Sequence, residues 1–282
     1  MSDPASLATQ AALDWGFPAP ELLRAGMNTL FTAGDEVMIR VGHPTFDRAA
    51  EQHFLALLSR QNVRAPRTLN DRDGGNGVVV TAIERVHPEG DIDWREVGAM
   101  IRLVHSIDPL DAVGLPWCGD FHHWRIRARL DEIGPTIDGG ARAGMEACLT
   151  RWPGWDTAMR GEPRVVCHGD VHPGNVIPTD AGPVIIDWDL RCMGPVVWDH
   201  APLMTWTERW GGEPGIYEQF ADGYGRSLRT DPLAGALSEM RLLAATLMRL
   251  RAAQTDAAAA VEAEVRLRWW RGDHAAPPWT AM

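Results

Sequence analysis

Two short stretches decide the fold of this 282-residue chain: residues 168–175, which read HGDVHPGN, and residues 185–189, which read IIDWD. The first has the form H-x-D-x-x-x-x-N, with a carboxylate five residues before a carboxamide. The second is an apolar run that ends in carboxylates. Between them, the turn residues TDAG separate the segments 175–178 and 183–187, and this pattern predicts a β-hairpin.

The predicted hairpin places three polar side chains near one another. Antiparallel pairing brings Asn175, which opens the first strand, and Asp187, which closes the second, to the same open end. Asp170 lies on the loop that enters that end. Two carboxylates and a carboxamide supply the oxygen ligands that Mg²⁺ prefers. The arrangement suits phosphoryl transfer, which needs a metal ion to neutralise phosphate charge and a base to orient the attacking hydroxyl.

On these residues, the chain resembles the aminoglycoside phosphotransferase and choline kinase-like family of small-molecule kinases. Residues 194–199, GPVVWD, are similar to the family's G-P-x-x-x-D segment. The resemblance implies that Asp170 is the catalytic base and that Asn175 and Asp187 hold magnesium. It also implies that His168 and Asp199 support the catalytic loop.

The N-terminal part resembles the nucleotide-binding part of the family. Gly26 and Asn28, within GMNT at residues 26–29, stand where the family places its nucleotide loop. The strand at residues 37–41 resembles the one that carries a phosphate-binding lysine, and here that position is Arg40. Glu51, in the following helix, resembles the glutamate that pairs with this cation. Arg40 can bind phosphate with two parallel hydrogen bonds and can pair with Glu51.

The resemblance also implies the fold, an α+β protein-kinase-like fold with two lobes. Residues 1–86 would form the nucleotide-binding lobe with a small antiparallel sheet. Residues 87–282 would form a helical lobe with the catalytic loop and the acceptor site. Glu84, within residues 83–86, lies at the expected hinge, where backbone groups could bind adenine.

Hydrophobic periodicity indicates the same order of elements. Asp3 and Pro4 begin a helix, and short apolar runs then predict a small sheet with one helix. The predicted strands cover residues 22–25, 30–32, 37–41, 67–69 and 78–83, with a helix over 45–60 and a loop over 70–77. Later helices are predicted over residues 94–107, 121–133 and 140–152, and Gly272 can end the last helix.

Composition limits the chemistry. All 27 basic residues other than histidine are arginine, so mechanisms that need a lysine amine are excluded. The net charge of −11 argues against nucleic-acid and membrane partners. The four cysteines form no C-x-x-C pair. We find no signal peptide and no apolar run of about 18 residues, so we expect a cytoplasmic protein.

The acceptor is predicted from the C-terminal part, which is rich in tryptophan and acidic residues. Tryptophan faces can hold cationic amines. Acidic residues outnumber the nearby arginines there, which favours a small, cationic acceptor such as an aminoglycoside, amino sugar or amino alcohol. The candidate acceptor residues are Asp189, Trp206 and Glu208, with Glu213 and Glu218 nearby.

The cofactors predicted are Mg²⁺ and ATP, with GTP as an alternative. Two other functions stay open at this point. The chain could be a nucleotide-binding pseudokinase with a regulatory role, a reading motivated by Arg40 in the lysine position. It could also be a metal-dependent hydrolase that uses its histidine and aspartate cluster. The sequence does not indicate the oligomeric state.

Overall fold

The computed structural model describes residues 3–26 and 28–280, and the chain separates into two compact units. The first comprises Met1–Asp93 and Asn175–Asp189, and the second comprises Trp94–Gly174 and Leu190–Met282. The hairpin belongs to the first unit because Ile185 N donates to Arg64 O and Glu89 N donates to Pro178 O. The border predicted after residue 86 therefore misses both residues 87–93 and the hairpin.

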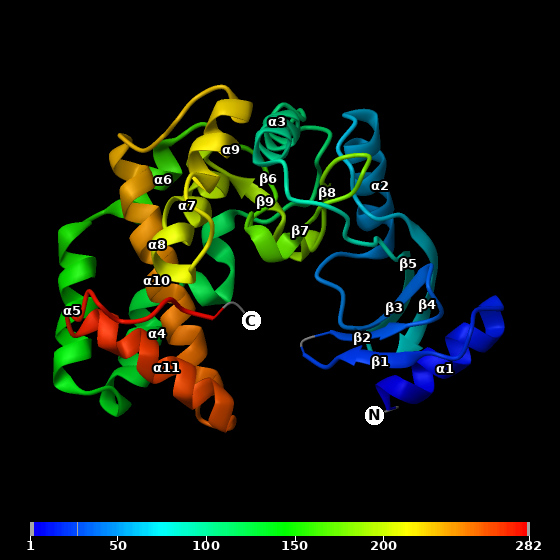
Figure 1. Cartoon of the computed structure of the whole chain (residues 1–282), viewed down its shortest axis with the longest axis horizontal. Helices are drawn as coiled ribbons and strands as arrows, with labels where there is room; N and C mark the ends of the chain where they lie inside the picture. The colour runs from blue at the N-terminus through cyan, green and yellow to red at the C-terminus, as the bar shows by residue number, and fades with distance from the viewer. Residues whose placement is uncertain (1–2, 27, 281–282) are drawn as a thin grey trace. The chain divides into compact units, whose positions relative to one another are not determined.

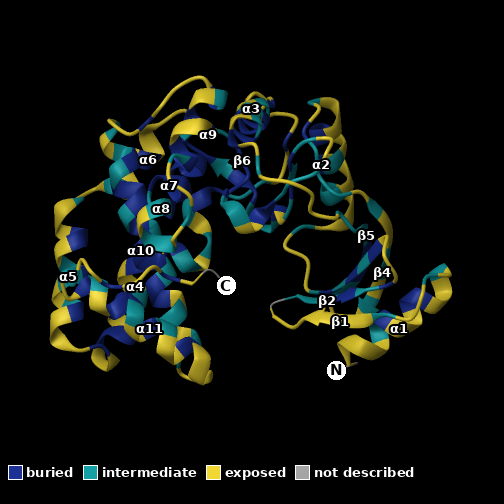
Figure 2. Ribbon diagram, viewed as in Figure 1, coloured by how far each residue is buried: buried dark blue, intermediate teal, exposed yellow. Residues whose placement is uncertain are grey.

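An antiparallel sheet forms the first unit, in the strand order β1-β2-β3-β5-β4 (Figure 1). Within it, β3 pairs with β5 so that Arg40 lies opposite Thr81. The strand β1 is exposed along its length, whereas the middle strands carry buried residues (Figure 2). The bounds are β1(Glu21–Arg24), β2(Thr29–Thr32), β3(Val37–Gly42), β4(Thr68–Gly75) and β5(Val78–Glu84).

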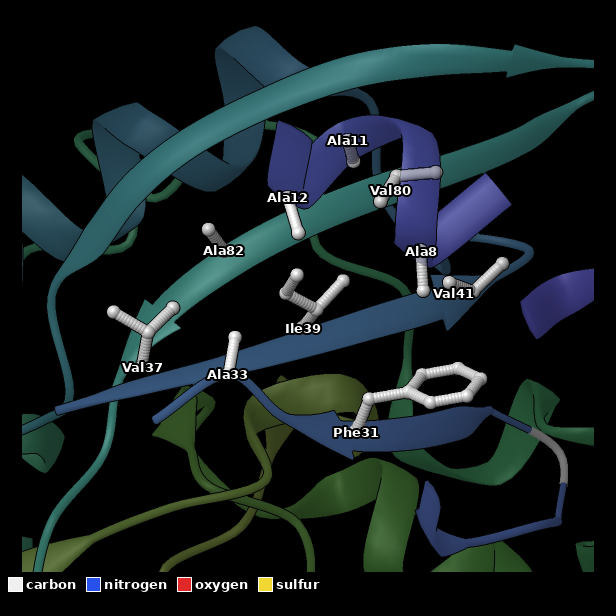
Figure 3. Close-up of a cluster of buried hydrophobic side chains, with 10 residues drawn as sticks. All are labelled: Ala8, Ala11, Ala12, Phe31, Ala33, Val37, Ile39, Val41, Val80 and Ala82. Atoms are coloured by element: carbon white, nitrogen blue, oxygen red, sulfur yellow. The ribbon is translucent and has the colours of Figure 1, made fainter. Parts of the chain in front are cut away.

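Helix α1(Pro4–Trp15) covers one face of this sheet, and its cap is the predicted one: the side chain of Asp3 accepts from Ser6 N. Ala8, Ala11 and Ala12 pack on the sheet, where Ile39 is fully buried (Figure 3). Small alanine side chains let the helix lie close to the strands. Alternate residues of a strand face opposite sides, so Arg40 lies on the face away from α1.

The segment predicted as a loop over residues 70–77 is mostly strand. The strands β4 and β5 are joined by a tight turn at Asn76 and Gly77, with φ of 54° and 76°. Such a turn has positive φ at both central residues, and Asn-Gly is its preferred sequence. The polar run at residues 70–73 concealed the strand, because β4 lies at the sheet edge with much of its surface in solvent.

Helix α2(Arg48–Arg60) begins at Asp47, whose side chain accepts from Ala50 N. Phe54 on α2 packs on Trp188, with ring centroids 5.4 Å apart. The predicted hairpin is present as β7(Val176–Ile177) and β8(Val184–Ile185). Helix α2 is thereby attached to the segment that follows the hairpin.

The second unit is mostly helical, and α10 packs against five other helices: α4, α5, α6, α7 and α11 (Figure 1). Helices α3 and α9 approach closely, since a Cβ on Gly98 would overlap the carbonyl of Phe220. The helices are α3(Trp94–His105), α4(Ile126–Ile133), α5(Gly139–Arg151), α6(Trp155–Gly161), α7(Val197–Met204), α8(Trp206–Trp210), α9(Ile216–Tyr224), α10(Pro232–Ala252) and α11(Ala257–Trp270).

Short elements complete the two units. The helix predicted over residues 121–133 begins only at Ile126, after separate 3₁₀ turns. No helix among residues 3–26 and 28–280 is long and apolar enough to cross a membrane. The remaining elements are β6(Val165–Cys167), β9(Cys192–Gly194) and the 3₁₀ turns η1(Cys118–Asp120), η2(His122–Trp124), η3(Gly134–Thr136), η4(Pro173–Asn175) and η5(Trp188–Leu190).

Candidate active site

The loop that carries Asp170 follows strand β6, which pairs with β9. Gly169 has a φ of +95°, and a Cβ there would overlap the carbonyl oxygen of Leu190. Only glycine fits at this position, because other residues rarely adopt this backbone conformation and have no room here. The tight turn directs the chain from the buried strand to Asp170, whose side chain is 34% exposed.

Asp199, on α7, holds this loop through its backbone. Its two carboxylate oxygens accept from His168 N and Gly169 N, each at 2.8 Å. Its Oδ2 also lies 3.1 Å from His105 Nε2. Burial alone would raise the pKa of Asp199, but the hydrogen bond with His105 and the nearby imidazoles outweigh it and hold the pKa below its usual range. A charged, fully buried carboxylate therefore fixes the start of the loop.

His168 is also fully buried, and its Nδ1 accepts from Asp170 N at 3.1 Å. This bond assigns the neutral tautomer with the proton on Nε2. The ring is thus bound to the backbone of Asp170.

The carboxylate of Asp170 has a basic partner at each oxygen. Arg241 Nη1 lies 3.3 Å from Oδ1, and His172 Nε2 lies 3.4 Å from Oδ2. Burial opposes ionisation, but the hydrogen bond from His172 and the positive charge of Arg241 hold the pKa of Asp170 well below its usual range. Asp170 is therefore ionised at neutral pH and able to accept a hydrogen bond from a hydroxyl.

Arg241 was not predicted from the sequence. It lies on α10, about 70 positions after the loop. The sequence pattern of this helix does not distinguish Arg241 from its other arginines. A single sequence offers no signal for such a contact. Only the packing of α10 under the loop places its guanidinium there.

Asn175 and Asp187 lie at the open end of the hairpin, in the first unit. Ile186 N donates to Asn175 O at 2.9 Å, which extends the β7–β8 pairing by one residue on each strand. Asp187 is exposed and has a φ of 61°. That left-handed conformation is uncommon outside glycine, although aspartate tolerates it better than most residues. The two side chains offer the hard oxygen donors that Mg²⁺ requires, so the residues fit a magnesium site.

Arg40 pairs with Asp189 rather than with Glu51, which corrects the predicted ion pair. Arg40 Nη2 lies 2.5 Å from Asp189 Oδ2, and Asn28 Nδ2 donates to the same oxygen at 3.3 Å. The reason is that Trp188, which precedes Asp189, is anchored on α2 and delivers the neighbouring carboxylate to Arg40.

The predicted nucleotide loop is only partly described. Met27, inside GMNT, lies outside the described residues. Gly26 is exposed, and the Asn28 side chain occupies the space where Gly42 lacks a Cβ. Asn28 therefore lies at the same end of β3 as the Arg40–Asp189 pair and contacts it.

Glu84, at the predicted hinge, forms a two-bond ion pair with Arg67, at 3.0 and 3.2 Å. The hydrogen bond from Arg67 lowers the pKa of Glu84. The N–H groups of Glu84 and Arg85 already donate to Arg67 O and Glu36 O, both at 2.9 Å. These two amides are therefore already paired within the unit, and the next N–H along the hinge belongs to Val86.

The predicted acceptor residues are divided between the two units. Asp189 belongs to the first unit, where it pairs with Arg40. Trp206 stacks with His172 and with Trp210, with ring centroids 4.8 Å and 5.2 Å apart. Glu208 lies two residues from each tryptophan on α8, so it projects from a different side of the helix.

Known proteins share this architecture. A model of the phosphotransferase enzyme family matches residues 37–243, more than half of the chain. Among solved structures, aminoglycoside 2'-phosphotransferase-IIIa in its GDP complex superposes with a TM-score of 0.71 at 14% identity, over 95% of this chain and 97% of that one. No curated protein matches the sequence.

Two further structures superpose on nearly the whole chain. The AMP-bound spectinomycin phosphotransferase has a TM-score of 0.69 at 14% identity, covering 98% of this chain and 99% of that one. A choline/ethanolamine kinase family protein from Mesorhizobium loti has a TM-score of 0.63 at 19% identity, covering 97% and 94%. The predicted α+β, protein-kinase-like fold is confirmed.

The fold and the family match together define the class. The chain belongs to the phosphotransferase enzyme family. It is a phosphotransferase with an alcohol group as acceptor, similar to the aminoglycoside phosphotransferases.

Proposed function

We propose that this protein is a Mg²⁺-dependent small-molecule kinase that transfers the γ-phosphoryl group of ATP or GTP to a hydroxyl. The observation that carries the proposal is the state of Asp170, an ionised carboxylate on a loop held by buried Asp199. Five residues later, the chain enters the hairpin whose open end carries Asn175 and Asp187. The proposed base and the proposed metal ligands thus follow one another along the chain, the base on the loop after β6 and the ligands on the β7–β8 hairpin.

In the proposed reaction, Asp170 accepts a hydrogen bond from the acceptor hydroxyl and orients its oxygen toward the γ-phosphorus. The new oxygen–phosphorus bond forms as the bond between the γ-phosphorus and the β,γ-bridging oxygen breaks. The nucleoside diphosphate leaves with that electron pair, and the hydroxyl proton passes to the Asp170 carboxylate. Because the pKa of Asp170 is low, its main contribution is orientation, and proton transfer comes late.

Asn175 and Asp187 would hold the magnesium ion, which when bound neutralises charge on the phosphate oxygens. The left-handed backbone at Asp187 sets the direction in which its side chain leaves the hairpin.

Arg40 would bind phosphate oxygens with its planar fork. It lies on the sheet face away from α1 and is already held by Asp189. Phosphate binding would exchange one partner of Arg40 for another. At the hinge, we expect Val86 to offer its N–H to the base of the nucleotide.

For the acceptor, we propose a small molecule with a hydroxyl. A cationic acceptor, such as an aminoglycoside, amino sugar or amino alcohol, has limited support. Two of the acidic residues that suggested it are paired, Asp189 with Arg40 and Glu218 with Arg229. Glu208 and Glu213 are exposed and would have to supply the attraction. Neutral alcohols therefore belong in the test.

The test is a coupled phosphotransfer assay with ATP and with GTP across aminoglycosides, amino sugars, amino alcohols and neutral sugars. We expect Mg²⁺-dependent turnover with at least one acceptor, and its loss in Asp170→Asn. Turnover retained in that variant would refute the role of Asp170. Binding of nucleotide without transfer to any acceptor would instead support a pseudokinase.

The pseudokinase is the second candidate because Arg40 is occupied by Asp189. If this ion pair stayed closed, Arg40 would not bind the phosphates, and a nucleotide held by other groups would not be activated. Isothermal titration with ATP, compared with the transfer assay, separates the two functions.

A further inference from the structure

Arg241 contacts three groups of the catalytic loop and its support at once. Its Nη2 donates to Gly169 O at 2.7 Å and to Trp198 O at 3.1 Å. Its Nη1 donates to Asp170 Oδ1 at 3.3 Å. The side chain is only 13% exposed and rises from the middle of α10. One guanidinium therefore joins α10, α7 and the loop that carries the proposed base.

Two tryptophans hold the guanidinium in place. The Arg241 guanidinium carbon lies 5.3 Å from the centroid of the Trp124 ring and 5.0 Å from that of Trp198. The two rings are themselves in contact, with centroids 4.4 Å apart. Contact between a cation and aromatic faces is favourable and restricts the rotamers of the arginine. Arg241 is thus a preorganised donor, with its charge partly shielded from solvent.

The other oxygen of Asp170 has a different partner. His172 Nδ1 accepts from Gly174 N at 3.0 Å, so the neutral ring carries its proton on Nε2, 3.4 Å from Asp170 Oδ2. The His172 ring stacks on Trp206 with an interplanar angle of 7°. Both contacts are long, 3.3 Å at Oδ1 and 3.4 Å at Oδ2, but the donor at Oδ1 belongs to a guanidinium that two further hydrogen bonds and two tryptophans hold in place. Oδ2 is therefore the oxygen suited to accept a substrate hydroxyl.

We propose that Arg241 is the positioning residue of the active site, which fixes Asp170 by binding its Oδ1 and the Gly169 carbonyl so that Oδ2 faces the acceptor hydroxyl. The proposal rests on the function proposed above, because it assumes that Asp170 orients the acceptor. The charged and titratable groups around Asp170 are Arg241 from α10, His168 and His172 from the loop, and His123 from η2. Arg241 is the one with permanent charge.

Arginine is needed here for its shape as well as its charge. Three acceptors lie around one planar group, and a lysine ammonium could reach them only one or two at a time. Loss of the fork would release the Gly169 carbonyl and let the Asp170 carboxylate rotate. Displacement of a reacting group by about 1 Å can cost about 100-fold in rate.

The experiment compares Arg241→Gln and Arg241→Lys with Arg151→Gln in the full-length protein. Arg151 is a matched control, because it is exposed and forms an ion pair with Glu239. Glu239 lies on α10, two residues before Arg241. The measurements are kcat, the KM for nucleotide and for acceptor, intrinsic ATP hydrolysis, thermal unfolding, and titration of the Asp170 carboxyl by ¹³C NMR.

We expect R241Q to lower kcat by about 100-fold while the KM for nucleotide changes by less than about twofold. We expect the acid limb of its rate profile and the Asp170 titration to move to higher pH, because the variant removes a cation that favours the carboxylate. R241K should keep the low pKa of Asp170, because the positive charge remains, but it should recover only part of the lost kcat. R151Q should match the wild type in all measurements.

The proposal is overturned if folded R241Q keeps wild-type kcat and Asp170 titration. It is also overturned if activity falls only in proportion to folded protein, with an unchanged pH profile. If R241Q does not fold, R241K decides, since full kcat in that variant would show that the fork is not required. If the wild type itself transfers no phosphate, the proposed function fails, whereas the NMR titration still tests the contact between Arg241 and Asp170.

Discussion

Arg40 and Asp189 form an ion pair, with 2.5 Å between Arg40 Nη2 and Asp189 Oδ2. Both side chains are partly exposed, at 28% and 21%. An ion pair in such surroundings contributes about 0–1 kcal/mol to stability, so it can exchange for a phosphate at little cost. The pair therefore makes Asp189 a competitor of the nucleotide for Arg40.

Asp189→Asn should release Arg40 and tighten binding of the nucleoside diphosphate by up to about fivefold, with a change in unfolding free energy below about 1 kcal/mol. Isothermal titration with ADP and with GDP measures the affinity. Arg40→Ala serves as the control, and it should weaken binding in the presence or absence of the Asp189 carboxylate. Weaker binding in Asp189→Asn would show that Asp189 helps to bind the nucleotide.

Asp170→Asn should lower kcat by about 10²–10⁴-fold, since the amide cannot accept the proton of the acceptor. Asparagine keeps an oxygen for Arg241, so thermal stability and nucleotide affinity should stay close to those of the wild type. Activity assays and calorimetry on the same preparation check both statements. A large loss of stability would mean that the carboxylate is mainly structural.

Asp187→Asn should raise the Mg²⁺ concentration for half-maximal activity by about tenfold or more, because a charged ligand becomes neutral. The measurement is a Mg²⁺ titration at saturating nucleotide. Asp180→Asn, in the turn of the same hairpin, is the matched control and should change nothing. An unchanged Mg²⁺ requirement in Asp187→Asn would remove this residue from the metal site.

Asp199→Ala should destabilise the protein by about 3–5 kcal/mol, because it leaves two buried N–H groups without an acceptor. Denaturant unfolding gives the value. Asp222→Ala, which removes an exposed ion pair with Arg95, should cost less than about 1 kcal/mol. Equal effects of the two substitutions would contradict the role of Asp199.

His200 should make the protein less stable in mild acid. Burial lowers its pKa from 6.5 to about 3, so the folded protein keeps His200 neutral while the unfolded chain takes up a proton below about pH 6.5. The unfolded state then binds more protons, so stability falls as pH decreases from about 6.5 toward 3, by about 1.4 kcal/mol per pH unit for one proton.

His200→Phe tests this prediction, because a phenyl ring can pack among the same aromatic neighbours, Phe220 and Tyr224. Denaturant unfolding at several pH values between 4 and 6.5 gives the unfolding free energy as a function of pH. The slope of this plot should correspond to about one proton fewer taken up on unfolding than in the wild type. The wild type, measured in parallel, provides the comparison. The same slope in His200→Phe and wild type would show that other groups cause the acid sensitivity.

Much of the fold follows from local patterns. The capped helix at Pro4, the apolar strands and the hairpin between Asn175 and Asp187 were all predictable, because turn residues and alternation are local signals. The part of β4 after residue 69 was missed because its polar side chains lie at the sheet edge, although Asn76-Gly77 signals the turn that follows it. The unit border was missed because hydrogen bonds of the hairpin to Arg64 and Glu89 are long-range.

The candidate site divides in the same way. The sequence by itself determined the order of Asp170, Asn175 and Asp187, since their spacing depends only on a loop and a hairpin. Tertiary structure decided which charges meet: Arg40 with Asp189 instead of Glu51, and Asp170 with Arg241. These partners lie far apart in the chain, and their contact depends on how helices and strands pack. Packing depends on the whole folded chain, so a short stretch of sequence does not predict these contacts.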